Sequence, residues 1–309
     1  MIPEKIQSLL SAQGFRFRAL PVSRLPQLKA DIQEHLDSGA LSPELVKPIR
    51  SLQQFAAPDW AAGGSIAIVA APSSRSVLVL SANGKRVEAA IPPTYVSAAA
   101  RDLGRKALEE ATGRRAEWAF LPVKTVAART GLARFGRNNV AYVEGMGSCA
   151  RLDAYYTEAD LGLDHWQERG VLPQCARCRL CLEACPTGAI LPDRFVIDAM
   201  RCLTHINEHQ GPFPDWVKTR WHNAVIGCMA CQEVCPVNKP YLAKVEKRVE
   251  LSEEETGLVL KGGEFEQLPA ALQGKLKSLE LEEYYGVLPR NLRALVGEEP
   301  FPGFPFSRD

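Results

Sequence analysis

Apolar residues recur every three to four positions through the first sixty residues, which is the spacing of helices that turn one face to a core. The two apolar stripes consist of Ile6, Leu9 and Leu10, and of Leu25, Leu28, Ile32 and Leu36. We expect a helix at each stripe, packed on the interior. A short strand is expected between the two helices, at residues 15–18.

Between residues 60 and 160 the pattern changes to short apolar runs separated by turn signals and helical stretches. Asn83-Gly84, a strong hairpin signal, lies between two of these runs. The expected strands are residues 65–70, 76–80, 85–89, 140–143 and 151–156, and the expected helices are residues 96–111 and 127–132. Strands that alternate with helices predict an α/β or α+β domain.

The chain from Tyr241 onward is charged and is expected to be helical, with a capping-box candidate at Ser252 and Glu255. The aromatic, proline-rich residues 301–306 do not suit a regular helix, so we expect them along the surface or in a groove. The expected domains are an α/β domain (1–165), a cysteine-rich domain (166–240) and a helical tail that packs back on the first domain (241–309).

Length and composition allow a substantial core without disulfide bonds, since the chain has 309 residues of which 46% are hydrophobic. Lys and Arg number 37 against 36 Asp and Glu, and the resulting net charge of +1 gives no signal of a polyanion-binding protein. The N-terminus does not read as a signal peptide, and no run approaches the ~18 apolar residues of a membrane span. We expect a soluble, cytoplasmic protein.

All nine cysteines lie between residues 149 and 235, and such clustering in a chain rich in apolar residues favours metal ligation over disulfides. Residues 175–186 read C-x2-C-x2-C-x3-C-P, the bacterial ferredoxin run. In this run three thiolates converge on one iron–sulfur cubane, and the fourth, which precedes a proline, ligates the other cluster.

A second run repeats the motif with its first gap expanded, from Cys202 to residues 228–236. Crossed ligation of the ferredoxin type then predicts two [4Fe–4S] clusters. Cluster 1 is expected on Cys175, Cys178, Cys181 and Cys235, and cluster 2 on Cys185, Cys202, Cys228 and Cys231. The alternative is a pair of structural zinc sites, but zinc needs only two C-x2-C pairs per site and has no use for this repeated triple spacing.

Other reactive residues give weaker signals. Cys149 stands apart from both runs and is expected to be a small buried hydrophobe. His205 and His209 could share one helical face, but no third ligand is apparent, and packing near a cluster is the simpler interpretation. The sequence contains no haem-attachment, dinucleotide-binding or Walker A motif.

Several stretches resemble the epoxyqueuosine reductase family and the related corrinoid-dependent reductive dehalogenases. The glycine-rich segment 130–139, which contains Gly136-Arg137-Asn138-Asn139, resembles the segment that lies near the corrin in both groups, and Gly147-Ser148 matches the next block. The family's second cysteine run contains an insert, which residues 211–214 and 222–228 resemble. The end of that run is resembled by residues 235–239.

This resemblance implies a flavin-reductase-like or nitroreductase-like α/β domain that carries cobalamin next to the clusters. The expected cofactor-binding residues are Gly136, Arg137, Asn138, Asn139, Gly147 and Ser148, and the fork of Arg137 would hold an anionic group of cofactor or substrate. A low-potential ferredoxin or flavodoxin would be the electron donor.

Three departures from the family pattern stand out. The tRNA-modifying members of the family carry an acidic Asp in an Asp-Ser-Ala-Pro motif; here Glu117 is the nearest match by spacing, and the surrounding motif is absent. Their Arg-Asp-Tyr-His stretch after the hairpin is replaced by residues 92–95, in which only the tyrosine, Tyr95, is kept. Tyr95 and Glu117 are the candidate proton donors, set against a packing tyrosine and a surface carboxylate. The 241–309 tail leaves little room for the repeat extension that helps to hold tRNA, which weakens a tRNA substrate.

These observations favour an iron–sulfur reductase, with the cobalamin that the resemblance implies, that acts on a small molecule or a modified nucleoside. Two alternatives stay open: an electron-transfer protein without catalysis, and a family member with another organic cofactor such as a flavin.

Overall fold

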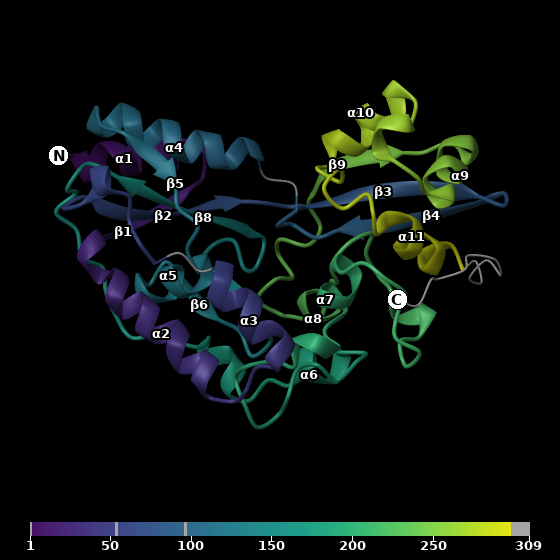
Figure 1. Cartoon of the computed structure of the whole chain (residues 1–309), viewed down its shortest axis with the longest axis horizontal. Coiled ribbons are helices and arrows are strands. Elements are labelled where there is room, and N and C mark those ends of the chain that lie inside the picture. Colours follow the sequence, from purple (N-terminus) through teal and green to yellow (C-terminus); the bar gives the residue numbers. More distant parts are fainter. Residues whose placement is uncertain (1, 53–54, 96–97, 298–309) are drawn as a thin grey trace.

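The computed structural model of the chain describes residues 2–52, 55–95 and 98–297. It has two lobes that lie side by side, each built on its own sheet, with the cysteine-bearing helices below and between them (Figure 1). Strands β2 and β3, which follow each other in sequence, belong to different lobes. No helix in the described ranges is long and apolar enough to cross a membrane.

The first lobe contains a four-stranded antiparallel sheet in the order β1-β2-β8-β5. Its strands are β1 (Arg16–Pro21), β2 (Ser65–Pro72), β5 (Ala116–Trp118) and β8 (Ala150–Thr157). Because successive side chains of a strand point to opposite faces, the continuous apolar run of β2 supplies two cores at once. The sequence predicts β1, β2 and β8 at these places, but it gave no signal for the three residues of β5.

Helices cover both faces of this sheet. On one face, α1 (Ile2–Ser11) and α4 (Ala98–Thr112) pack against Ala67, Val69 and Tyr155. The other face packs against α2 (Leu25–Asp37), α5 (Val123–Arg129) and the small sheet of β6 (Ala133–Phe135) and β7 (Ala141–Val143). Helix α3 (Pro43–Leu52) follows α2. The predicted apolar stripes of α1 and α2 are therefore confirmed as core.

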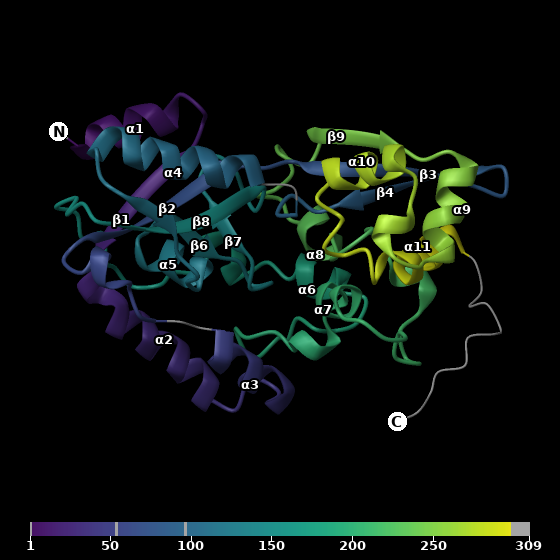
Figure 2. The same ribbon diagram turned by 45° about the horizontal axis from the view of Figure 1, so that its top comes forward.

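The second lobe joins a hairpin from the first half of the chain to the C-terminal tail. Strands β3 (Arg75–Ala82) and β4 (Lys85–Ile91) are connected at Asn83 and Gly84, which both have positive φ as a tight hairpin turn requires. Strand β9 (Val245–Glu250) pairs parallel with β3. Helices α9 (Glu253–Lys261), α10 (Ala270–Ser278) and α11 (Leu288–Val296) enclose the core of this sheet (Figure 2).

The expectation of a purely helical tail is wrong at residues 245–250, which form β9. This segment is rich in charge and lacks a strong strand signal, but the edge of β3 offers unpaired backbone groups, and Arg248 bonds to Glu88 across the new sheet. The capping box at Ser252 and Glu255 is confirmed. Residues 301–306 lie outside the described residues.

Candidate functional site

The first cysteine run folds into two short turns. Cys175 lies in the 3-10 turn Pro173–Ala176, and Cys181 lies in α6 (Leu180–Ala184), which ends at Cys185. Cys185 has extended backbone angles, as expected for a residue that precedes a proline. The chain therefore leaves the helix at this cysteine, which separates its thiol from those of the first three.

The second run repeats this geometry around α8 (Ala230–Glu233), with Cys231 inside the helix and Cys228 and Cys235 on either side. Cys202, which lies far upstream in sequence, caps the start of α7 (Leu203–Glu208). Helices α6 and α8 pack against each other, so the two runs face one another.

The cysteines of the two runs lie close to one another. Burial raises the pKa of Cys181, and so do the nearby thiols of Cys175, Cys178 and Cys235. Burial also raises the pKa of Cys228, with Cys202 and Cys185 as its thiol neighbours. Cys231 has thiol neighbours in both predicted sets, Cys228 and Cys202 in one and Cys181 in the other. The crossed assignment of the eight ligands stays a prediction.

The donor set suits iron–sulfur clusters. All nine cysteines are free, and the eight in the two runs are half-buried. In the described ranges, no three His, Cys, Asp or Glu side chains converge closely enough to hold a single metal ion. Each cysteine of a cubane ligates its own iron, so the four sulfurs stand further apart than the ligands of one zinc. By type and number, the thiols fit two cubanes.

Hydrogen-bond donors surround the sulfur atoms. The Nδ2 of Asn223 donates to the Sγ of Cys228 at 3.3 Å, and the Oδ1 of Asn223 accepts from the backbone N–H of Met229. The Oγ1 of Thr187 lies 3.6 Å from the Sγ of Cys185. Such contacts stabilise negative charge on the ligands of a cluster.

The glycine-rich segment, expected beside the corrin, contacts the cluster domain. The Nε and Nη2 of Arg137 donate to the backbone carbonyls of Cys178 and Cys175 at 3.0 and 2.8 Å. Two donors of its fork are therefore engaged by the loop of cluster 1. Asn138 is buried and donates to the hydroxyl of Tyr142, whereas the carbonyl of Asn139 accepts from the Nζ of Lys124.

Gly147 and Ser148 also contact the cluster domain. The backbone N–H of Ser148 donates to the Oδ1 of Asn238 at 2.8 Å, and its hydroxyl donates to Gln232 in α8. Gly147 has a φ of 61°, and a Cβ there would lie 2.5 Å from the Oδ1 of Asn238. The glycine therefore permits the close approach of the two domains.

Residues 174–238 match the family described as a 4Fe-4S double cluster binding domain. The epoxyqueuosine reductase of Atelocyanobacterium thalassa is 32% identical over 120 residues, which cover 38% of each chain. That of Bacillus subtilis is 32% identical over 117 residues, which cover 38% of this chain and 29% of the relative. The chain is similar to epoxyqueuosine reductases over this part of its length. It spans well under two thirds of the length of these curated relatives.

Solved structures of epoxyqueuosine reductases share the fold of this chain. The structure from Streptococcus thermophilus has a TM-score of 0.58 at 17% identity and covers 94% of this chain and 82% of its own. The structure from Bacillus subtilis, with its catalytic aspartate loop swung out of the active site, has a TM-score of 0.61 at 18% identity and covers 96% and 82%. The family match supports two 4Fe-4S clusters on the eight cysteines.

The two predicted proton donors lie on different lobes. Tyr95 is half-buried, contacts Tyr284 edge-on at 5.4 Å and packs on the core of the second lobe. Its hydroxyl donates to the carboxylate of Glu208, and the pKa of Tyr95 is raised by burial and by this carboxylate. Glu117 lies on β5 of the first lobe, where Arg115 pairs with it.

Glu208 and Lys124 are further candidate site residues that the sequence motifs do not include. Burial raises the pKa of Glu208. Lys124 is exposed to solvent, yet burial among surrounding protein atoms lowers its pKa, while Cys202 raises it. The ammonium of Lys124 is near the thiol of Cys202, a predicted ligand of cluster 2. Neither residue belongs to a motif, so only the fold identifies them.

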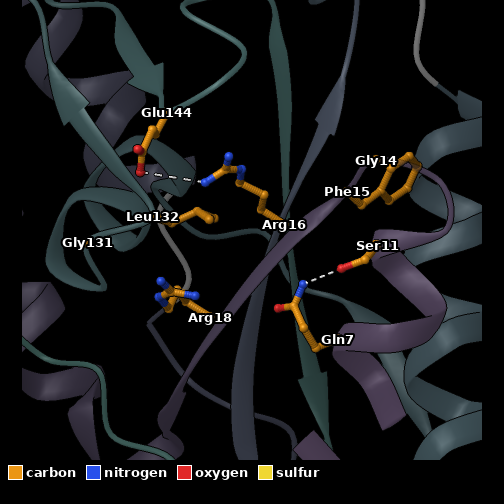
Figure 3. Close-up of a pocket in the computed structure, with 9 residues that line it drawn as sticks. All are labelled: Gln7, Ser11, Gly14, Phe15, Arg16, Arg18, Gly131, Leu132 and Glu144. Carbon is orange, nitrogen blue, oxygen red and sulfur yellow. Dashed lines mark hydrogen bonds and ion pairs between the residues drawn. The ribbon is translucent and has the colours of Figure 1, made fainter. Parts of the chain in front are cut away.

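The remaining predicted candidates are structural. The rings of His205 and His209 lie 3.8 Å apart, and burial and then His209 lower the pKa of His205. Cys149 is buried, as predicted. One cavity of about 460 Å³ lies between α1, β1 and the turn after α5, with Arg16 facing Glu144 at 3.7 Å (Figure 3). Its lining includes none of the predicted site residues.

Proposed function

We propose that this protein is an iron–sulfur reductase in which two [4Fe–4S] clusters pass single electrons to a substrate held beside cluster 2. The observation that carries the proposal is the repeated cysteine run, whose eight half-buried thiols lie in the residues that match a 4Fe-4S double cluster binding domain. A ferredoxin or flavodoxin is the proposed electron donor. Clusters of this type work at low potential, which suits a demanding reduction.

A corrinoid is the proposed organic cofactor, held next to Lys124 and Cys202. When bound, it supplies a strongly reducing cobalt centre. Lys124 would pair with an anionic group of the cofactor, beside the turn at Asn139 whose carbonyl accepts from this lysine. The support comes from the family resemblance of residues 130–148 and from the position of Lys124.

Tyr95 and Glu208 form the proposed proton supply. Burial raises the pKa of the Glu208 carboxyl, which favours its protonated form. With Glu208 protonated, Tyr95 would give its hydroxyl proton to the substrate and take the carboxyl proton of Glu208, which is left as the carboxylate to which the Tyr95 hydroxyl donates in this structure. Glu117 does not suit this task, because it lies on β5 and is paired with Arg115.

The proposed substrate is a modified nucleoside that bears an epoxide, as the name of the relatives indicates. Reduction of an epoxide to an alkene takes two electrons and two protons and releases water. One relative was solved with an epoxyqueuosine-modified tRNA stem loop, at a TM-score of 0.57 and 18% identity, covering 96% of this chain and 82% of its own. Presentation of the nucleoside in tRNA is therefore part of the proposal.

Anaerobic reconstitution tests the cofactor. The purified protein is incubated with hydroxocobalamin and desalted, and the retained corrinoid is measured by visible absorption. We expect stoichiometric retention, a more than tenfold loss in Lys124→Glu and no loss in Lys106→Glu, whose exposed lysine pairs with Asp102 on α4. An iron-loaded protein that retains no corrinoid would remove the cobalamin from the proposal.

The alternative is an electron-transfer protein without catalysis. It is favoured by the pairing of Glu117 with Arg115 and by the loss of the Arg-Asp-Tyr-His stretch at residues 92–95. Turnover of an epoxyqueuosine-bearing tRNA stem loop by the reduced holoprotein separates the two. The reductase forms the alkene product, whereas the electron carrier forms none.

A further inference from the structure

Apolar side chains are exposed next to predicted ligands of cluster 1. Leu180, which directly precedes Cys181, is 44% exposed, and Val234, which directly precedes Cys235, is 39% exposed. They lie at the start of α6 and at the end of α8, two helices that pack against each other. Both side chains therefore leave apolar surface in contact with water beside the cluster, as is typical of interaction sites.

The second cysteine run covers the equivalent positions. Aligning the C-x2-C-x3-C part that the two runs share places Arg179 and Leu180 opposite Met229 and Ala230. Met229 is fully buried, whereas Arg179 is exposed. Ile226, just before the C-x2-C of the second run, is buried in the core of the second lobe. The loop of cluster 1 is thus the one that faces solvent, and α6 lies away from both sheets (Figure 1).

The solvent-facing loop also carries unpaired positive charge. Arg177 and Arg179 are exposed, and neither guanidinium has an ion-pair or hydrogen-bond partner among the described residues. Glu183 is the single acid between positions 171 and 185, and Glu233 of α8 pairs with Arg75 at 3.6 Å. Apolar side chains flanked by unpaired arginines complement a partner surface that is apolar at its centre and acidic at its rim.

We propose that Leu180, Val234, Arg177 and Arg179 form a surface, here called the cluster 1 face, that docks a small acidic one-electron carrier protein. The inference rests on the proposed function, in which the substrate lies beside cluster 2, because this leaves cluster 1 as the entry point for electrons. In each encounter one electron leaves the reduced carrier and takes cluster 1 from [4Fe–4S]²⁺ to [4Fe–4S]⁺, and no bond or proton is exchanged.

A protein suits this face better than RNA does. An RNA loop is recognised by aromatic side chains that stack on its bases, whereas the apolar side chains of the cluster 1 face are aliphatic. Encounters between electron-transfer proteins bury little surface and depend on electrostatic steering, so two arginines and two exposed apolar side chains are enough to direct them.

The test is the reduction of the reconstituted protein by a reduced acidic ferredoxin, followed by stopped-flow absorption. Arg177→Glu/Arg179→Glu should slow this reaction about tenfold at low ionic strength, and added salt should slow the wild type but not the variant. The control with the same change in net charge is Arg114→Glu/Arg220→Glu, whose exposed arginines also lack ion pairs in the described part of the chain. It should stay within about twofold of wild type.

Leu180→Ser tests the apolar part of the face. It should slow the reaction with ferredoxin about threefold at low and at high salt, because the lost contact is not electrostatic. Its control is Leu103→Ser on α4, since Leu103 is 43% exposed and far from the cysteine runs in sequence. Dithionite needs no docking surface and should reduce all variants at the wild-type rate.

Equal ferredoxin rates in wild type and in Arg177→Glu/Arg179→Glu, both fully loaded with iron, would overturn the inference. Weaker binding of a tRNA stem loop by that variant at an unchanged ferredoxin rate would assign the arginines to RNA instead. If the variant does not assemble its clusters, a wild-type rate that depends neither on salt nor on Leu180→Ser would refute the docking face. Wild-type protein that binds no iron would refute the proposed function itself, so the two failures are distinguishable.

Discussion

Arg137 shows how a single side chain can tie the two domains together. Its guanidinium reaches from the first lobe to the carbonyls of two cluster 1 cysteines. The sequence identified this arginine as important, but it placed the fork on a cofactor. A Gly-Arg-Asn turn does not reveal what lies opposite it, because the cysteine loop is about forty residues away in the chain.

Replacing Arg137 should make cluster 1 less stable, so that it loses iron more readily. In Arg137→Ala, two carbonyls lose charge-assisted hydrogen bonds that are worth about 1.5–3 kcal/mol each at partly buried sites. We expect iron to be lost at least several-fold faster from the variant under a chelator, as followed by visible absorption. Arg134→Ala is the control, since Arg134 is exposed. Equal rates of iron loss from wild type and Arg137→Ala would show that the hydrogen bonds of Arg137 do not stabilise cluster 1.

His222, in the insert of the second cysteine run, is a buried histidine that should lower the stability of the folded protein at acidic pH. It is 9% exposed, lies 4.3 Å from the ring of Phe213, and neither ring nitrogen has a hydrogen-bond partner. Burial, and then Arg290, lowers its pKa to about 4. The folded protein therefore holds this histidine neutral where the unfolded chain, with a pKa near 6.5, takes up a proton.

Stability should fall as the pH drops from about 6.5 towards about 4, because the unfolded state then binds more protons than the folded state. This one group should cost about 2 kcal/mol between pH 7 and pH 5. Urea unfolding under anaerobic conditions at the two pH values measures the loss. His222→Phe should reduce the loss by that amount, whereas exposed His209→Gln should retain it; identical slopes for all three proteins would refute the assignment.

At the scale of elements, the predictions hold where the local pattern is strong. The hairpin of β3 and β4 follows from Asn83-Gly84 between apolar runs, and α9 follows from its capping box. Strand β9 could not be predicted, because its pairing with β3 joins segments more than 150 residues apart. Its register depends on the partner strand and not on its own sequence.

The capping box gives a direct test of α9. The Oγ of Ser252 accepts from the backbone N–H of Glu255 at 3.1 Å, and the Glu255 carboxylate accepts from the backbone N–H of Ser252 at 2.8 Å. Ser252→Ala should lower the free energy of unfolding by about 1 kcal/mol. Ser278→Ala, at the exposed end of α10, should change it by less than about 0.5 kcal/mol. Equal effects of the two variants would show that the box does not stabilise the lobe.

At the scale of the whole molecule, the cluster domain is held by both lobes. Arg137 and Ser148 bind it from the first lobe, and buried Asn291 of α11 donates to the carbonyls of Asn207 and Val225 from the second. The cysteine spacing predicted the clusters, since that spacing is a local property of the chain. Lys124 and Tyr95 lie near Cys202 only because distant segments meet in the fold, so no local pattern could reveal their positions.

Iron analysis with Mössbauer spectroscopy of oxygen-free protein tests the crossed cysteine sets most directly. Two cubanes require eight irons per chain, all with the spectrum of [4Fe–4S] centres, and Cys185→Ser should disturb only the cluster that Cys202, Cys228 and Cys231 share with it. Zinc in place of iron, or four or fewer irons per chain in the unaltered protein, would contradict the assignment.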